Sequence, residues 1–259
     1  MPSVSNIAVG AAMAGAAATK ARHSMNESIA RLSTGIRTMY GGDAAGQSIA
    51  NSIGSKGASF SVAARNAEDG ISFLQAAESV LLELAALTTR MRELGLQEGN
   101  RNLLSTSDLT ALNAEAAAIS AAFTAITTNT KFNGIVVTGD ADIAIAIDDS
   151  GNTVTVGSTA GLTALAVTGT TAVVTADVTQ SEIASALGAV AAGMSALKGY
   201  QSVASSTAAN LNAAAARIQD TDYAMETANL TKATILNQAA MAMVSQANDA
   251  QAAVLAVIQ

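Results

Sequence analysis

The chain of 259 residues contains no cysteine, no tryptophan and a single proline, Pro2. The lack of cysteine excludes a disulfide framework and thiol catalysis, and it suits a protein that is exported into an oxidising exterior. Because the only proline is the second residue, nothing in the rest of the chain removes a backbone donor from a helix. Long uninterrupted helices are therefore expected.

Aromatic and basic residues are also scarce. Phe and Tyr make up 3% of the residues, which is low for a globular enzyme, because aromatic side chains supply much of a compact core. The formal charge is −7 and Lys and Arg do not cluster, so no basic face is available for nucleic acid. No stretch of about 18 strongly apolar, uncharged residues is apparent, which predicts no membrane span.

The apolar run at residues 8–18 does not have the features of a signal peptide. No Lys or Arg precedes it, and it consists mainly of alanine and glycine. We interpret it as mature sequence, so a protein that leaves the cell would be exported without a cleaved signal peptide.

Half of the residues are hydrophobic, and the commonest of these is alanine, which has the highest helix propensity. From Ile183 to Ile218, apolar or small residues recur at alternating spacings of four and three, which is typical of a coiled-coil seam. At ~1.5 Å per residue this helix spans roughly 50 Å. Residues 74–91 and 109–126 repeat the pattern, so three helices are expected to form a bundle. Ser105 or Ser107 is expected to cap the helix that begins after the turn at residues 99–107.

Both ends of the chain carry the same spacing, but many of the periodic positions are occupied by alanine or glycine instead of large apolar residues. One such helix pair would bury little area by itself, so we expect the stripes to be completed by neighbouring copies. The candidate self-assembly residues are Met25, Ile29, Leu32, Ile36 and Met39 near the start and Leu236, Met243, Val254 and Val257 near the end.

Between residues 138 and 179 the composition changes to Thr, Val, Gly, Asp and Ser. Ile143, Ile145 and Ile147 alternate before the DDSGN segment at 148–152, a pattern that predicts a β-hairpin. Asn133-Gly134 marks another turn, where helix gives way to extended chain. The expected order is helices, a short β insert, and helices again.

Several motifs together resemble bacterial flagellins. In the first 135 residues these are LSTGIR at 32–37, DAAGQ at 43–47, RNAEDGIS at 65–72, RMREL at 90–94 and KFNG at 131–134. In the C-terminal part they are DYA at 222–224, ILNQA at 235–239 and QAN at 246–248. Gly42 departs from the family pattern, which commonly has Asp before DAAG.

The resemblance implies a mainly α, elongated protein built from long coiled-coil helical hairpins with a small β-hairpin region. An inner terminal coiled-coil domain would comprise residues 1–40 and 220–259. An outer helical bundle would comprise residues 41–219, with the hairpin insert at about 135–180. The short middle of the chain predicts a thin filament without outer decoration.

The implied function is that of a structural subunit, which polymerises into the extracellular helical flagellar filament used for motility. Implied partners are further copies of the chain, an export chaperone, the flagellar export apparatus, and the filament cap and hook-junction proteins. Met241, Met243, Val244 and Leu255 would form the face that the chaperone covers. Two alternatives stay open: a hook-filament junction protein, and a secreted coiled-coil adhesin that forms a closed oligomer.

Arg90, Leu94 and Glu115 occupy positions similar to those through which a host Toll-like receptor senses many flagellins. The favoured interpretation of the wider set, which includes Arg92 and Glu93, is charged packing between neighbouring subunits.

No catalytic, cofactor or metal site is predicted. His23 is the only histidine, so it lacks the partners that a metal site or catalytic triad would need. Asp220, Asp222 and Glu226 could be read as paired catalytic acids, but a helix-surface or subunit-contact role is favoured because no pocket residues accompany them. We therefore do not expect an enzyme.

Overall fold

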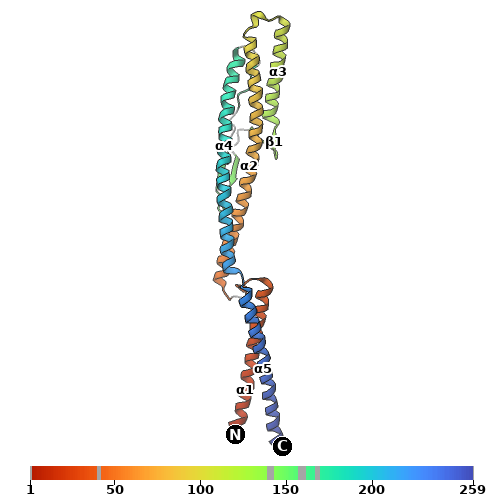
Figure 1. The fold of residues 1–259 in the computed structure, drawn as a ribbon, viewed down its shortest axis with the longest axis vertical. Helices are drawn as coiled ribbons and strands as arrows, with labels where there is room; N and C mark the ends of the chain where they lie inside the picture. Colours follow the sequence, from red (N-terminus) through yellow and green to blue (C-terminus); the bar gives the residue numbers. More distant parts are fainter. Residues whose placement is uncertain (1, 40–41, 139–142, 157–161, 167–169, 259) are drawn as a thin grey trace. The chain divides into compact units, whose positions relative to one another are not determined.

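The computed structural model describes residues 2–39, 42–138, 143–156, 162–166 and 170–258. Within these residues, long α-helices dominate, and two small antiparallel hairpins lie between the third and fourth helix (Figure 1). The helices are α1 (Pro2–Thr34), α2 (Ala44–Glu98), α3 (Thr106–Asn129), α4 (Thr170–Gln219) and α5 (Tyr223–Ile258), with a short 3-10 helix η2 (Arg101–Leu103). The predicted mainly α fold with a small β region is confirmed.

The chain forms two compact units. The terminal unit comprises Met1–Gly54 with Asn212–Gln259, and the central unit comprises Ser55–Leu211. Both boundaries lie within helices, α2 and α4, whereas the sequence-based division placed them at residues 40 and 220, in the turns where helices end.

The central unit is a bundle in which α2 runs antiparallel to α3 and α4 (Figure 1). The predicted seams form its core, as expected from their spacing. On α2, Leu74, Leu81 and Leu84 have no exposed surface, and on α4, Leu197 has none and Ile183 is 1% exposed. Phe123 supplies the largest buried side chain of α3.

The connection from α2 to α3 ends in a capping box. The Ser105 hydroxyl accepts a hydrogen bond from the backbone N–H of Asp108 at 3.2 Å, and the Asp108 carboxylate accepts one from the Ser105 N–H at 3.0 Å. These bonds satisfy two backbone donors at the helix start. The pKa of Asp108 lies below its ordinary value, chiefly because the Ser105 hydroxyl also donates to the Asp108 carboxylate at 2.7 Å, and next because of the Ser105 N–H. Of the two predicted caps, Ser105 is therefore the one that is used.

Each hairpin follows from its turn residues. Asn133 and Gly134 both adopt positive φ, 49° and 83°, and connect β1 (Lys131–Phe132) to β2 (Ile135–Val136). Such φ values are those of the tight turns that match the twist of paired strands. The sequence predicted a turn at this place, and the structure shows that it closes a hairpin.

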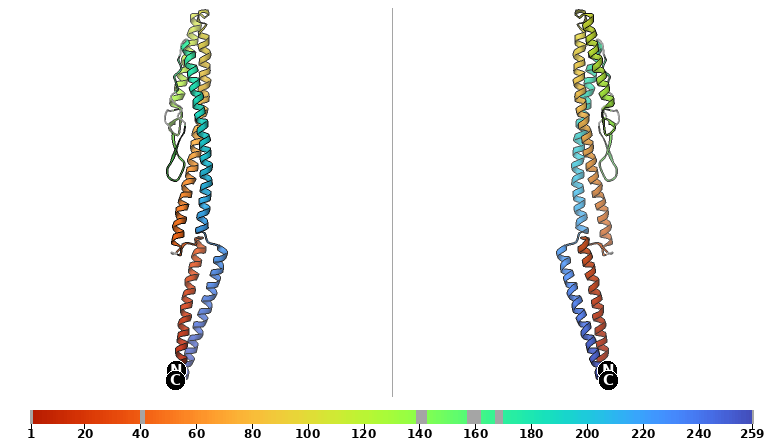
Figure 2. Two further views of the ribbon diagram at one scale, coloured as in Figure 1. Left: turned by 90° about the vertical axis from the view of Figure 1, so that its left-hand side faces the viewer. Right: turned by 90° about the vertical axis from the view of Figure 1, so that its right-hand side faces the viewer.

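In the second hairpin, which the alternation predicts, β3 (Ile143–Ala146) pairs with β4 (Thr153–Val156). Ile143 lies opposite Val156, and Ile145 lies opposite Val154. The hairpin lies along α2 and α4 (Figure 2).

The start of α4 differs from the sequence-based expectation. That expectation assigned residues up to about 180 to the β insert, but α4 begins at Thr170. The first turns of α4 are rich in Thr and Val, which favour strands in isolation. Ala172 and Ala176, only 2% and 0% exposed, pack here, so tertiary packing decides for the helix over local propensity.

Two glycines make room for the second hairpin. A Cβ on Gly70 of α2 would collide with Ile145 of β3 and would lie 2.9 Å from Leu197 Cδ1 of α4. On α4, a Cβ on Gly193 would lie 3.1 Å from Leu74 Cδ1 and 3.5 Å from Val156 of β4. The absence of a side chain at these two glycines therefore allows the hairpin to pack closely against α2 and α4.

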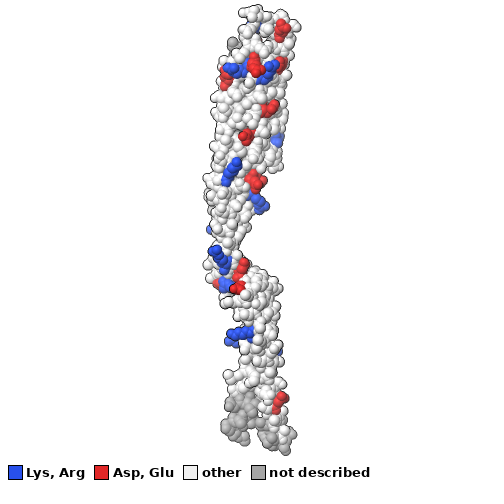
Figure 3. All heavy atoms as spheres, in the orientation of Figure 1, with Lys and Arg blue, Asp and Glu red and all other residues white. Residues whose placement is uncertain are grey.

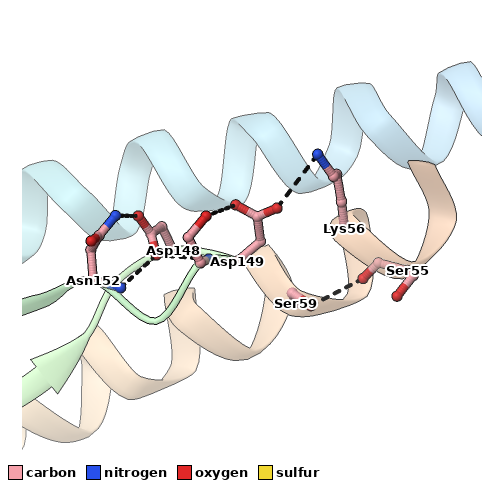
Figure 4. Close-up of polar contacts among 7 residues, drawn as sticks. Ser55, Lys56, Ser59, Asp148, Asp149 and Asn152 are labelled. Atoms are coloured by element: carbon pink, nitrogen blue, oxygen red, sulfur yellow. Dashed lines mark hydrogen bonds and ion pairs between the residues drawn. The ribbon is translucent and has the colours of Figure 1, made fainter. Parts of the chain in front are cut away.

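The tip of this hairpin is held by polar contacts (Figure 4). The carboxylate of Asp148 accepts hydrogen bonds from the N–H groups of Ser150 and Asn152 at 2.9 and 2.8 Å, and from the Asn152 side-chain amide. The Asn152 amide is the main cause of a lowered pKa at Asp148. Asp149 lies 3.8 Å from Lys56 Nζ, an ion pair that ties the tip to α2.

In the terminal unit, α1 and α5 lie side by side and antiparallel (Figure 1). Every buried hydrophobic residue described on these two helices is an alanine: Ala18 and Ala21 on α1, and Ala233 and Ala240 on α5. Small residues allow close approach of the two backbones, but each contributes little buried apolar area.

The expectation that no segment is apolar enough to cross a membrane needs correction. Helices α2 and α3 each contain an 18-residue window with a mean hydropathy of 1.4. Length and composition alone are weak evidence for a span, because core helices of bundles pass the same test. In α2 the apolar residues include the buried seam leucines, and in α3 the apolar content is mainly alanine.

Candidate assembly surfaces

Several larger apolar side chains of the terminal helices are exposed to the solvent. Ile29 is 48% exposed on α1, and Leu236 and Met243 are 52% and 63% exposed on α5. Met25 and Leu32 are half-buried. The side chains of Val254 and Val257 lie outside those that the structure describes. The helix pair therefore packs through alanine and presents several of its predicted assembly residues to the solvent.

Further exposed apolar residues lie on the same two helices, and the sequence stripes did not include them. They are Val9 and Met13 on α1 and Tyr223, Met225, Ile235 and Met241 on α5. A helical surface with this many exposed large hydrophobic side chains marks an interaction site.

Ile36 and Met39 lie in the connection after α1, where the backbone forms a clasp with the end of α4. Gly35 adopts φ 72°, which favours glycine, and Ile36 forms an isolated antiparallel bridge with Asp220. The N–H of Arg37 donates to Gln219 O at 2.7 Å, and the N–H of Thr221 donates to Gly35 O at 2.8 Å. Ile36 is thus fixed by main-chain hydrogen bonds.

Arg37, which the sequence analysis did not single out by chemistry, joins three helix ends. Its guanidinium donates to Ile218 O at 2.8 Å near the end of α4 and pairs with Asp43 at 3.1 Å. Asp43 in turn accepts from the Gly46 N–H at 2.8 Å at the start of α2. The Gly46 hydrogen bond, followed by that of Arg37, lowers the pKa of Asp43.

The acidic residues near the start of α5 have structural partners. Asp222 accepts hydrogen bonds from the N–H groups of Ala224 and Met225 at 2.9 and 3.1 Å, which makes it the cap of α5. Glu226, only 7% exposed, lies 3.5 Å from Arg31 of α1. His23 lies 3.6 Å from Glu27, one turn along α1. Among the described residues, no three His, Cys, Asp or Glu side chains are grouped closely enough to hold a metal ion.

The second candidate set lies in the central unit and forms ion pairs between helices. Arg90 of α2 donates to Glu115 of α3 at 2.6 and 2.9 Å and to Glu93 at 2.9 Å. Glu115, then Glu93, raises the pKa of Arg90. Figure 3 shows blue and red spheres gathered in a band near the α2–α3 connection. The structure thus brings Arg90, Glu93 and Glu115 together at the surface.

Arg92 and Leu94 separate from this group. Arg92 points to α4, where its Nε lies 2.6 Å from Asp177 Oδ1. Leu94 is 1% exposed and belongs to the bundle core. The sequence analysis missed Asp177, because no local pattern signals which residue of a distant helix will lie opposite Arg92.

Comparison with known proteins gives the family. A family model described as the bacterial flagellin N-terminal helical region matches residues 5–137, and one described as the C-terminal helical region matches residues 170–258. The chain belongs to the bacterial flagellin family. It is accordingly a structural subunit of a flagellar filament, which is extracellular.

Individual relatives support the same assignment. A flagellin of Halalkalibacterium halodurans is 33% identical over 245 residues, covering 88% of this chain and 90% of the relative. The flagellar filament 33 kDa core protein of Treponema phagedenis is 30% identical over 270 residues, covering 91% and 93%. Flagellin A of Vibrio cholerae is 40% identical over 117 residues, but these are 45% of this chain and 31% of that protein.

Proposed function

We propose that this flagellin polymerises into a helical filament through the exposed apolar faces of α1 and α5. In that filament, residues 1–40 and 220–259 form the inner coiled-coil layer, and residues 41–219 form the outer layer. The chain acts by assembly and carries no catalytic role.

The observation that carries the proposal is the composition of the α1–α5 contact. The pair buries alanines, while Met13, Ile29, Leu236 and Met243 are 70%, 48%, 52% and 63% exposed. Each large apolar side chain gains about 1.5–3 kcal/mol when it is fully removed from water. Neighbouring copies that cover these side chains would supply the burial that the isolated helix pair lacks.

The contact must be heterologous, because two different faces have to meet for a chain of copies to grow without closing. The terminal unit offers two such faces, one on α1 and one on α5, each with its own exposed residues. Repetition of one heterologous contact produces a helical polymer, whereas a self-complementary contact would stop at a dimer.

The test is electron microscopy of the purified chain after addition of a salting-out precipitant. We expect long uniform filaments from the unsubstituted chain and none from Met243→Asp, which places a charge in the proposed contact. Ser245→Asp is the matched control, because it adds the same charge to an exposed position of the same helix and is expected to assemble. Small closed oligomers from all three chains would favour the adhesin alternative instead.

The junction-protein alternative is separated from the filament by length. A junction protein would form short assemblies that stop after a limited number of copies, even at high subunit concentration. Filaments that lengthen with added subunits would exclude it.

The remaining proposed partners are the proteins that export the subunit and those at the two ends of the filament. We infer that an export chaperone covers Met241, Met243 and Val244 of α5, of which the first two are 47% and 63% exposed. Leu255, the fourth predicted residue, has a side chain outside those described. Passage through the flagellar export apparatus without a cleaved signal peptide would leave residues 8–18 in the secreted chain, which N-terminal sequencing of filament protein would show. Interaction with the filament cap and hook-junction proteins follows from the same assembly role.

For Arg90, Arg92, Glu93 and Glu115 we infer a charged surface that braces the bundle and lies at contacts between subunits. Leu94 lies in the core, so a host Toll-like receptor would meet the charged side chains and not this leucine. A receptor reporter assay with the unsubstituted monomer and Arg90→Ala tests this. An equal absence of response from both chains would remove the receptor as a partner.

A further inference from the structure

The central unit carries two apolar features that its own fold leaves unmatched: a projecting leucine and a cavity. We propose that they fit each other between copies, so that Leu103 of one chain enters the cavity of the next. This inference rests on the proposed polymerisation and adds a second contact, made by the central unit and separate from the faces of α1 and α5.

The projecting leucine lies at the α2–α3 connection. Leu103, in η2, is 88% exposed, the highest value among the exposed large hydrophobic residues described. Arg101 lies two positions before it on the same short helix and forms no ion pair with the described part of the chain. The connection therefore presents an apolar side chain next to a free positive charge.

The cavity lies beside the middle of α2, under the two hairpins. It has a volume of about 400 Å³ and is lined mainly by apolar residues: Phe73 and Gly70 of α2, Phe132 and Ile135 of the first hairpin, and Ile143 and Ile145 of the second. The rings of Phe73 and Phe132 meet edge to face with centroids 5.9 Å apart. Phe132 and Ile135 remain 38% and 47% exposed, so the wall of the cavity is incompletely covered.

The charges beside the two features are opposite in sign, which supports the proposed contact. Asp69 is the one charged residue among those lining the cavity, it is exposed, and it forms no ion pair within the described residues. A leucine that enters the cavity would bring Arg101 to the rim where Asp69 lies. An apolar contact flanked by one pair of opposite charges is the arrangement of interfaces in which rim charges fix register.

The two features cannot meet within one chain, because the cavity lies beside the middle of α2 and Leu103 lies beyond the end of that helix. From Gly70 to the connection at Asn100 the distance is roughly 45 Å at 1.5 Å per residue. Figure 1 shows the connection at one end of the central unit and β1 beside the middle of α2. A heterologous contact with this offset repeats along the direction of α2, so successive copies would be displaced by roughly 45 Å in that direction.

Cross-linking in assembled filaments tests the contact, and the absence of native cysteine removes any background. The chain with both Leu103→Cys and Ile135→Cys, treated with a short bismaleimide, is expected to give a ladder of covalent multimers. The matched control combines Leu103→Cys with Val203→Cys, which is 63% exposed on α4 of the same unit but outside the cavity, and should remain monomeric. The same variants cross-linked before assembly should also remain monomeric.

Charge reversal gives a second readout on the otherwise unaltered chain. Arg101→Asp and Asp69→Arg are each expected to slow assembly severalfold, and the double variant should recover most of the lost rate. Filaments that form normally, yet show no ladder above the Val203 control and no effect of either reversal, would overturn the contact and leave polymerisation through α1 and α5 intact. If the unsubstituted chain forms no filaments, both proposals fall.

Discussion

The two units of this flagellin use the same heptad-like spacing with different side chains. The central unit fills its seams with Leu, Ile, Met and Phe, and Leu74, Leu81, Leu84, Met91 and Leu197 have no exposed surface. The terminal unit buries alanine and leaves several of its large apolar residues exposed. Equal periodicity therefore leads to unequal burial, because the size of the side chain at each seam position sets the apolar area removed from water.

This difference in burial gives the two units different roles in stability and assembly. A bundle with a leucine core is stabilised by its own contacts, whereas a pair of alanine-lined helices depends on surfaces supplied by others. A subunit that is stable in one part and incomplete in another can exist as a monomer and still gain free energy on assembly. The predictions below begin where this contrast is strongest.

The largest expected effect is the loss of a seam leucine. Leu81→Ala should destabilise the central unit by about 2–5 kcal/mol, because it removes buried methyl groups and leaves a cavity. Leu82→Ala, at the next position but 56% exposed, is the control and should cost less than about 1 kcal/mol. Hydrogen exchange measured by mass spectrometry on central-unit peptides would report both. Equal losses would mean that the seam is not the source of stability.

The next largest loss of stability is expected when a glycine beneath the hairpin is replaced by alanine. Gly70→Ala puts a methyl group against Ile145 and Leu197 and should cost about 1–3 kcal/mol, with faster exchange in β3 and β4 as the hairpin is displaced. Gly188→Ala on α4 has no atom within 4 Å of the added carbon. It should instead stabilise α4 by up to about 1 kcal/mol through helix propensity. The prediction is tested by whether the two substitutions change the stability of the central unit in opposite directions.

A smaller effect is expected at the helix cap. Ser105→Ala removes the acceptor for the Asp108 N–H and should cost about 1 kcal/mol, seen as fraying of the first turn of α3. Ser107→Ala, the alternative cap suggested by the sequence, should have little effect. A larger loss from Ser107 than from Ser105 would contradict the observed capping box.

The smallest expected effect is a loss of folding stability at acidic pH. Asp43 in the terminal unit and Asp148 in the central unit both have pKa values lowered below the ordinary 3.8, chiefly by the Gly46 N–H and by Asn152 respectively. A lowered folded-state pKa gives stabilisation that is present above 3.8 and is lost as the pH falls through the folded value. Urea unfolding between neutral pH and acid should show this loss. In Asp148→Asn the central unit's share of the pH dependence should shrink, and an unchanged profile would exclude Asp148 as a contributor.

Several elements follow directly from local sequence. The seam from Ile183 to Ile218, the hairpin with its turn at residues 148–152 and the turn at Asn133-Gly134 were all predicted correctly, because each depends on the period of side chains or on backbone freedom at one position. The first turns of α4 were missed because Thr and Val favour strands until packing against the bundle is included.

The candidate sites were predictable as residues but not as arrangements. Periodicity located Ile29, Leu236 and Met243 on the terminal helices, yet it did not show that alanines take the contact between α1 and α5 and leave these three outside. Likewise the RMREL motif drew attention to Arg90 and Leu94. Only packing shows that one pairs across helices and that the other is buried.

By itself, the sequence determined the helical class, the position of the turns, the seam spacing and the family, because these depend on residue types at short separations along the chain. The tertiary structure decided which stripe faces inward, which charges meet, and where the hairpin sits. Asp177 opposite Arg92, Lys56 beside Asp149, and Gly70 beneath Ile145 are pairs 85, 93 and 75 positions apart. Such contacts depend on how whole helices pack, and no local period records that.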